Sequence, residues 1–188
     1  MKITGGEACG RPIEIPPHPG VRPTGSKMRE ALFNILGKLV ENAQFLDLFA
    51  GSGLMGFEAL SRGAGFLTLV EKNPVCIQTI KDNIAMLGYE KKTKIIQADV
   101  RRALASLNQD QFNIIFADPP YKSENSQVVV NIVQERQLLR TNGLLIIEHD
   151  KDMVLEADNK ELRLMECRPY GQSAFSFFIA KKPSMSTK

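Results

Sequence analysis

Residues 44–63, "QFLDLFAGSGLMGFEALSRG", decide the fold expected for this chain. The stretch starts as a short apolar run with one carboxylate, Asp47, which is typical of a buried strand that ends in a loop. Gly51, Gly53 and Gly56 follow at GxGxxG spacing, and a segment with helical periodicity comes next. A strand, a glycine loop and a helix in this order predict a turn in which the backbone approaches a ligand closely.

The alternation of strand and helix continues along the chain. The predicted strands are 44–50, 66–71, 93–99, 112–118 and 142–150, and the predicted helices are 53–63, 73–88, 101–108 and 126–139. Such alternation is typical of a parallel sheet with helices on both faces. Residues 160–182 read as two strands joined near Tyr170 and Gly171, so we expect the sheet to end in an antiparallel pair.

The two ends of the chain differ from this pattern. Residues 1–25 are rich in glycine and proline, and we interpret them as an N-terminal extension of the same domain with short strands or a hairpin. A helix is expected from Ser26, which is a suitable N-cap. The main domain then covers residues 26–182, and residues 183–188 are expected to be a flexible tail.

Composition narrows the class of protein. The 188 residues, 43% of them hydrophobic, suit one globular domain, and a net charge of +3 neither requires nor excludes a polyanionic partner. No apolar run reaches the roughly 20 residues of a membrane span, and the N-terminus lacks a signal peptide, so a cytoplasmic location is expected. Cys9, Cys76 and Cys167 are too widely spaced for a metal knuckle, and His18 and His149 stand alone, so we expect no metal site.

A carboxylate, Glu71, ends the second predicted strand about 20 residues after Gly51. Glu71 at this position can accept both hydroxyls of an adenosine ribose, which favours a nucleoside-containing cofactor over a purely structural turn. The residues expected to contact this cofactor around the loop and after the second strand are Asp47, Phe49, Ala50, Gly51, Ser52, Gly53, Glu71, Lys72 and Asn73.

Asp47 bears on which cofactor binds. A dinucleotide would place an anionic pyrophosphate near this carboxylate, whereas S-adenosylmethionine brings a cationic ammonium and sulfonium. Asp47 therefore favours the methyl donor over an NAD-linked dehydrogenase, although a turn cap bonded to backbone N–H groups is the alternative. Asp99 closes the third strand, where it could accept the adenine amino group while Val100 borders the ring; the alternative for Asp99 is an ordinary helix N-cap.

The fourth strand ends in "DPPY", residues 118–121. Two prolines remove two N–H groups and fix the backbone, so the local carbonyls form a stiff platform of acceptors. Asp118 and the Pro119 carbonyl could accept hydrogen bonds from an amino group and stabilise the positive charge that develops during its attack. Pro120 would stiffen this platform and Tyr121 would stack on a base. The alternative is a plain strand terminator.

These motifs, together with "RPTGSKMREALFNIL" at residues 22–36, resemble the RsmD family of bacterial 16S rRNA guanine-N2 methyltransferases over nearly the whole chain. The resemblance implies a class I, Rossmann-like methyltransferase fold with a mostly parallel seven-stranded sheet, and S-adenosylmethionine as cofactor. It also implies that Asp47, Gly51, Gly53, Glu71 and Asp99 hold the donor. Asp118, Pro119, Pro120 and Tyr121 would hold the target amino group, and Asp118 would also border the cofactor.

The resemblance implies 16S rRNA or a 30S particle as partner, bound by a chain that we expect to be monomeric. Candidate RNA contacts are Arg11, Arg22, Lys27 and Arg29, with a solvated basic surface as the alternative. Lys27 stands where the family usually has arginine, and Ala8 and Cys9 replace aromatic and basic residues, which concerns the RNA contacts rather than the chemistry.

Two other functions stay open at this point. A DNA adenine-N6 methyltransferase, or another amino-methyltransferase, shares DPPY, but the chain lacks a separate target-recognition domain. A non-catalytic RNA-binding assembly factor with the same fold is the rival from another class, and the intact glycine loop and DPPY argue against it.

Overall fold

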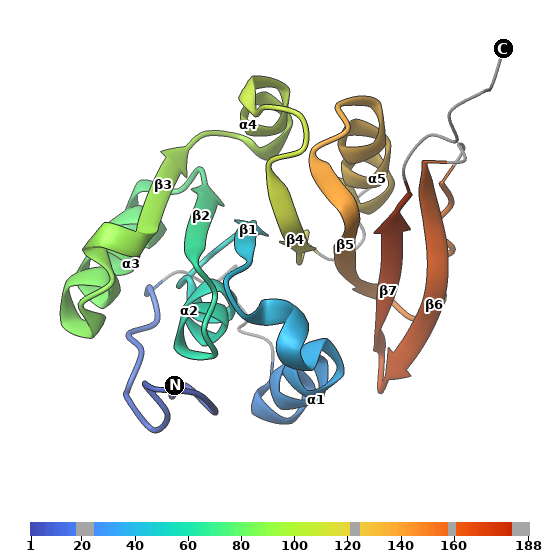
Figure 1. The fold of residues 1–188 in the computed structure, drawn as a ribbon. Helices are drawn as coiled ribbons and strands as arrows, with labels where there is room; N and C mark the ends of the chain where they lie inside the picture. The colour runs from blue at the N-terminus through green and yellow to red at the C-terminus, as the bar shows by residue number, and fades with distance from the viewer. Residues whose placement is uncertain (18–24, 121–124, 158–160, 182–188) are drawn as a thin grey trace, which may run out of the picture. The chain divides into compact units, whose positions relative to one another are not determined.

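The computed structural model describes residues 1–17, 25–120, 125–157 and 161–181, and Figure 1 traces them in colour from the N-terminus to the C-terminus. The chain forms two compact units, Met1–Ala103 and Leu104–Lys188. The predictions for His18, Arg22, Tyr121 and the tail at residues 183–188 lie outside the described residues.

The first unit is built on three parallel strands, in the order β3-β2-β1. Their bounds are β1 (Gln44–Leu48), β2 (Phe66–Glu71) and β3 (Thr93–Gln97). The helical segments are α1 (Ser26–Leu36), η1 (Gly37–Val40), α2 (Leu54–Ser61), α3 (Pro74–Leu87), η2 (Glu90–Lys92) and α4 (Val100–Ser106), of which α4 runs across the boundary between the units. Helix α2 packs on β1 and β2, and α3 packs on β3. The strands β1 and β2 are buried almost along their whole length, which explains their near-continuous apolar sequences.

The ends of α3 follow the capping rules, whereas the start of α1 does not. The Asn73 side chain accepts a hydrogen bond from the N–H of Val75 at 2.9 Å, Pro74 is the first helical residue, and Gly88 ends the helix at φ 76°. The prediction that Ser26 is the N-cap is wrong. Ser26 is the first helical residue, and the N-cap is Gly25, which has no side chain to accept a capping hydrogen bond.

The second unit holds four strands in the order β4-β5-β7-β6. Strands β4 and β5 are parallel, and β7 pairs antiparallel with both β5 and β6. The bounds are β4 (Phe112–Ala117), β5 (Leu139–Asp150), β6 (Leu162–Tyr170) and β7 (Ser173–Ala180), and helix α5 (Asn125–Glu135) packs on β5. The expected turn after Tyr170 is present, with Gly171 at φ 65°.

Two boundaries in the second unit lie more than two residues from the prediction: the end of α5, and the start of β5, which was expected at residue 142. The helix expected to reach residue 139 ends at Glu135, because Gln137 adopts a positive φ of 49° that no α-helix accommodates. The buried Leu138 then leads into β5, which starts at Leu139.

The N-terminal segment, residues 1–17, forms a small hairpin-like turn. An isolated antiparallel bridge joins Lys2 and Pro12, and the N–H of Ile13 donates to the Met1 carbonyl at 2.7 Å. Ile3 and Ile13 are buried, so they anchor the segment. The prediction of a mostly parallel seven-stranded α/β fold with an antiparallel C-terminal end and a short N-terminal extension is confirmed.

Within the described ranges, no helix is both long and apolar enough to span a bilayer. The same residues contain no group of three or more histidine, cysteine or acidic side chains placed to hold a metal ion.

Candidate active site

The glycine loop between β1 and α2 is strongly curved. Phe49, Gly51 and Gly53 adopt positive φ values of 61°, 57° and 78°. Phe49 is not a glycine, so its left-handed conformation stores strain of about 1–3 kcal/mol, which is a feature of ligand-binding turns. At Gly53 a Cβ would lie 2.6 Å from the Phe57 ring, so both its conformation and its surroundings require glycine.

Gly56 has a different function from the two glycines before it. It lies in α2, where a Cβ would come within 2.6 Å of the Leu67 side chain on β2. The third glycine of the motif therefore allows close packing between helix and strand, as the spacing predicts.

Glu71 fixes the loop from the end of β2. Its Oε2 accepts the N–H of Gly51 at 2.9 Å, and its Oε1 accepts the N–H groups of Lys72 and Asn73, each at 2.8 Å. A carboxylate offers about four acceptor positions, so one ribose hydroxyl can bind without displacing a backbone partner. Gly51 and Glu71 are thus in direct contact, as their spacing in the sequence suggests. Glu71 was predicted to accept both ribose hydroxyls, but its carboxylate already accepts hydrogen bonds from three backbone N–H groups.

Asp47 is buried beneath the same loop. The residue is 2% exposed, and its Oδ2 accepts the N–H of Gly56 at 3.0 Å. Burial raises the pKa of this carboxyl to about 7; the hydrogen bond from Gly56 opposes that shift and the charge of Glu71 adds to it. The hydrogen bond to Gly56 agrees with the alternative that Asp47 binds backbone N–H groups. With a pKa of about 7, the Asp47 carboxyl is close to half protonated near neutral pH when no cation is bound. Contact with a methyl donor stays a prediction for Asp47.

Asp99 lies at the exposed start of α4. Its Oδ1 accepts the N–H of Arg101 at 3.0 Å, so the side chain caps this helix. Val100, next to it, is buried. The second carboxylate oxygen of Asp99 forms no hydrogen bond with the described residues and can accept one from a ligand.

The proline platform belongs to the second unit. It follows β4, whose last residue Ala117 pairs with Ile147 of β5. Asp118 is half-buried, Pro119 is buried and Pro120 is exposed. The prolines leave this stretch with carbonyl acceptors and no N–H donors of their own. The parallel pairing places Asp118 at the carboxyl end of a buried strand, which is where ligands of open α/β sheets bind.

Arg29 was predicted to contact RNA, and its position contradicts that prediction. The side chain is fully buried in α1; its Nε lies 3.1 Å from Glu58 Oε2, and its Nη2 donates to the Lys2 carbonyl at 2.9 Å. Burial alone would raise the pKa of Glu58, but hydrogen bonds from Thr4, Arg62 and Arg29 hold it below its usual value. This network attaches the N-terminal segment to α1 and α2, and a guanidinium enclosed in this way cannot reach a phosphate.

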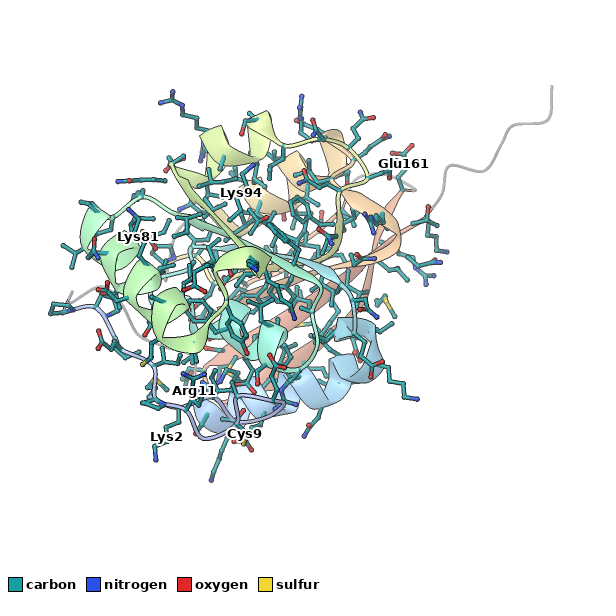
Figure 2. All side chains as sticks on the ribbon, turned by 60° about the vertical axis from the view of Figure 1, so that its left-hand side comes forward. Lys2, Cys9, Arg11, Lys81, Lys94 and Glu161 are labelled. Carbon is teal, nitrogen blue, oxygen red and sulfur yellow. The ribbon has the colours of Figure 1, made fainter. Side chains whose placement is uncertain are left out.

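Arg11 and Lys27, the other two candidate RNA contacts that the structure describes, are exposed. Figure 2 shows Arg11 with Lys2 and Cys9 on the N-terminal segment, and the Arg11 guanidinium donates to the carbonyls of Leu87 and Met86 at the end of α3. Lys27, in the first turn of α1, is exposed and free of ion pairs with described residues. These two side chains are placed where a phosphate could approach, and their contact with RNA stays a prediction.

His149 and the cysteines have no place in either site. His149 is buried, with Nδ1 2.8 Å from the Asp150 carbonyl and Nε2 2.7 Å from Ser176 Oγ. This histidine therefore packs within the second unit. Cys9, Cys76 and Cys167 are free thiols, and of the three only Cys76 is buried.

The sequence patterns did not single out the buried polar residues that bond to the N-terminal segment, which include Asn83 and Ser61 besides Glu58. Asn83 of α3 and Ser61 of α2 are at most 3% exposed and bond to the N-terminal segment. The only available signal was a polar side chain among apolar helical positions. That signal is weak, because it does not name the partner.

Solved structures define the class of protein to which this fold belongs. The Escherichia coli protein yhhF has a TM-score of 0.85 at 30% identity, over 97% of this chain and 99% of its own. An RNA methyltransferase from Salinibacter ruber, solved with S-adenosyl-L-homocysteine, has a TM-score of 0.65 at 12% identity, over 88% of this chain and 97% of its own, and at that identity shows the fold alone. The chain therefore has the fold of S-adenosylmethionine-dependent methyltransferases.

The family follows from the sequence. The family described as "Conserved hypothetical protein 95" matches residues 1–179, and the chain belongs to it. The relative named "Ribosomal RNA small subunit methyltransferase D" of Escherichia coli strain K12 is 32% identical over 178 residues, which cover 95% of this chain and 89% of the relative. The resemblance to the RsmD family is confirmed.

Proposed function

We propose that the protein transfers a methyl group from S-adenosylmethionine to the exocyclic N2 amino group of one guanine in 16S rRNA of the small ribosomal subunit. The observation that carries the proposal is a glycine loop bonded to Glu71 in a chain whose fourth strand ends in Asp118, Pro119 and Pro120. Membership of a family with a relative named for small-subunit rRNA methylation supports the choice of RNA.

The donor would lie over the glycine loop. Glu71 is suited to accept a ribose hydroxyl, and the free oxygen of Asp99 is suited to accept the adenine amino group. Asp47 would attract the ammonium of the methionine part, and this cation would in turn favour the charged form of Asp47. The Asp47 carboxylate would instead repel a dinucleotide, whose pyrophosphate is negative.

The acceptor would lie on the proline platform. The guanine N2 nitrogen is a poor nucleophile because its lone pair is delocalised into the ring. Hydrogen bonds from this amino group to Asp118 and to the Pro119 carbonyl would favour a pyramidal nitrogen and stabilise the positive charge that forms on it. Stacking on Tyr121 would align the nitrogen with the methyl–sulfur bond.

The proposed step balances without a further reactant. The nitrogen lone pair forms the new N–C bond while the electron pair of the S–CH3 bond stays on sulfur, which becomes the neutral thioether of S-adenosylhomocysteine. The methylated nitrogen then carries one proton too many, and Asp118 or water accepts it. No metal is needed, and we expect a cytoplasmic monomer to perform the reaction.

Transfer of a radioactive methyl group tests this proposal. Purified protein would be incubated with tritiated S-adenosylmethionine and with naked 16S rRNA, assembling 30S particles or mature 30S particles from a strain that lacks the modification. We expect label in at least one RNA substrate with wild-type protein, and a rate of labelling at least about 10²-fold lower with Asp118→Ala. Absence of label from all three RNA substrates would contradict the proposal, and label on adenine in a parallel reaction with unmethylated DNA would favour the rival activity.

A further inference from the structure

Asn83 is a buried polar residue that the proposed reaction does not use. It lies on the inward face of α3, where Ile80, Ile84 and Leu87 are apolar and buried, and it is 0% exposed. Its side-chain amide nevertheless makes three hydrogen bonds, none of them to another residue of α3. A fully bonded amide at such a position fixes the groups to which it bonds, because a buried partner left without it would lose its hydrogen bond.

One of these groups is the carbonyl of Ser52 in the glycine loop, which accepts from Asn83 Nδ2 at 3.2 Å. This carbonyl belongs to the same peptide unit as the N–H of Gly53, which donates to the Ala50 carbonyl at 2.7 Å. Both polar groups of the unit are therefore bound and the orientation of its plane is fixed. Gly53 would permit other orientations at little cost if the bond from Asn83 were lost.

The other two bonds go to the N-terminal segment. Asn83 Oδ1 accepts the N–H of Glu14 at 2.9 Å, and Nδ2 donates to the carbonyl of the same residue at 3.0 Å. The side-chain amide thus pairs with the backbone of Glu14 as a neighbouring strand would, whatever side chain stands at that position. Asn83 joins the N-terminal segment to the glycine loop through a single planar group.

We infer that Asn83 is a positioning residue for cofactor binding: it holds the Ser52–Gly53 peptide in the orientation that S-adenosylmethionine requires and makes that orientation depend on the N-terminal segment. The inference rests on the proposed use of the glycine loop for this cofactor, and it is independent of which base is methylated. Displacement of residue 14 would loosen the loop although the two are far apart in sequence.

The direct test is Asn83→Asp, with S-adenosylmethionine as the probe. The substitution keeps the size of the side chain and an acceptor for the Glu14 N–H, but it places an oxygen against the carbonyls of Glu14 and Ser52. We expect calorimetry to show cofactor affinity about 5- to 100-fold weaker than in wild type. The KM for S-adenosylmethionine should rise by a similar factor, while kcat at saturating cofactor stays within about threefold.

Two further variants separate positioning from folding. Asn34→Asp makes the same chemical change at an exposed position of α1 and should leave the affinity for S-adenosylmethionine unchanged. Glu14→Pro removes the N–H that donates to Asn83 and leaves Asn83 itself unchanged, although it also fixes φ at residue 14, and we expect cofactor affinity to fall about two- to tenfold. Glu14→Pro also tests the inference if Asn83→Asp does not fold.

The outcomes are distinct. Wild-type affinity in Asn83→Asp, or in Glu14→Pro when Asn83→Asp does not fold, would overturn the inference and leave the proposed function intact. A fall in kcat with an unchanged KM for S-adenosylmethionine would also overturn it. A wild-type protein that binds no S-adenosylmethionine would contradict the proposed function, and the inference with it.

Discussion

The strand-end acids and the N-terminal cations are two sets of charged residues with different fates. Glu71 and Asp99 are bonded to backbone N–H groups at the ends of strands that the sequence predicted. Among the cations, Arg29 is buried in an ion pair while Lys27, two residues earlier on the same helix, is exposed. A strand end defines where a side chain lies, whereas a positive charge on a helix does not define which way it faces.

The difference follows from what each prediction used. The acids were identified by their position relative to strands and to a glycine loop, and this position determines their surroundings. The cations were identified by charge alone, and charge does not distinguish a buried, paired side chain from an exposed one. The variants below test whether the strand-end set carries the chemistry and whether the N-terminal set divides into structural and RNA-contacting members.

The largest expected effect is at the proline platform. Asp118→Ala should lower kcat by about 10²- to 10⁴-fold, because the developing charge on the amino nitrogen loses its acceptor. Cofactor affinity measured by calorimetry should change by less than about threefold. Asp152→Ala, an exposed acid in the same unit, is the matched control and should keep full activity. A parallel loss of activity, cofactor affinity and thermal stability would instead assign Asp118 to folding.

Arg29→Met should mainly affect stability. The substitution removes one of the two cations that bind the buried Glu58, whose remaining partners are Arg62 and Thr4, and it leaves the Lys2 carbonyl without its donor. It should lower the free energy of unfolding by about 1–3 kcal/mol, measured by urea denaturation. Lys27→Met, on the same helix, is the control and should change it by less than about 0.5 kcal/mol. If the two variants had equal stability and Arg29→Met lost only RNA binding, the division of the cations would be wrong.

Glu71→Gln tests the acid that fixes the loop. The amide replaces one acceptor oxygen by a donor, which would face a backbone N–H group, so the loop and the ribose contact should both weaken. We expect affinity for S-adenosylmethionine to fall about 10- to 100-fold in calorimetry. Gln78→Ala, at an exposed position of α3, should bind as tightly as wild type. Full affinity in Glu71→Gln would remove the main support for the loop as the donor site.

Asp47 gives a pH-dependent prediction with a defined sign. Its pKa is raised from 3.8 to about 7 in the folded protein, so its favourable contribution to stability is complete below pH 4 and is lost as the pH rises towards 7. Asp47→Asn removes this loss and should be more stable than wild type at pH 8, by on the order of 1–3 kcal/mol, but not at pH 4. Thermal denaturation at the two pH values measures the difference, and an equal effect at both would show that the carboxyl does not titrate in this range.

The same titration should affect the cofactor in the opposite direction. Protonation of Asp47 removes the charge that would attract the methionine ammonium, so affinity for S-adenosylmethionine should fall as the pH drops below 7, and Asp47→Asn should remove that dependence. A pH-independent wild-type affinity between pH 6 and 8 would argue against contact between Asp47 and the donor.

The smallest expected effect concerns Lys27. If it contacts a phosphate, Lys27→Ala should weaken RNA binding only a few-fold and reduce the slope of log affinity against log salt by about 0.7–0.9. Filter binding over a range of salt concentrations measures this slope. An unchanged slope would mean that the exposed lysine is simply solvated.

The parts of the fold that sequence patterns predicted share a local physical cause. Asn73 and Gly88 bound α3 because capping depends on residues within one turn, and Gly53 is required by its own φ and by a side chain four residues away. The end of α5 was predicted too late because Gln137 adopts a left-handed conformation, which sequence patterns expect of glycine and not of glutamine. Local chemistry was readable, and an exception to residue preference was not.

The missed features depend on partners distant in sequence. Arg29 bonds to Glu58, and Asn83 bonds to Glu14 and Ser52, over separations of 29 to 69 residues. No local pattern specifies such pairs, so their residues read as a surface cation and an ordinary helical asparagine. The site was therefore predictable where backbone geometry builds it and unpredictable where long-range side-chain bonds support it.

The central claim is that this chain methylates a guanine amino group of small-subunit rRNA, and mapping the modified nucleotide tests it most directly. Nucleosides from 16S rRNA of cells with and without the gene would be compared by mass spectrometry, and the differing position located by primer extension. The account predicts one N2-methylguanosine that is present with the gene, absent without it and restored by wild-type protein but not by Asp118→Ala. Identical 16S rRNA modification in the two strains, or a difference at a nucleoside other than guanosine, would contradict it.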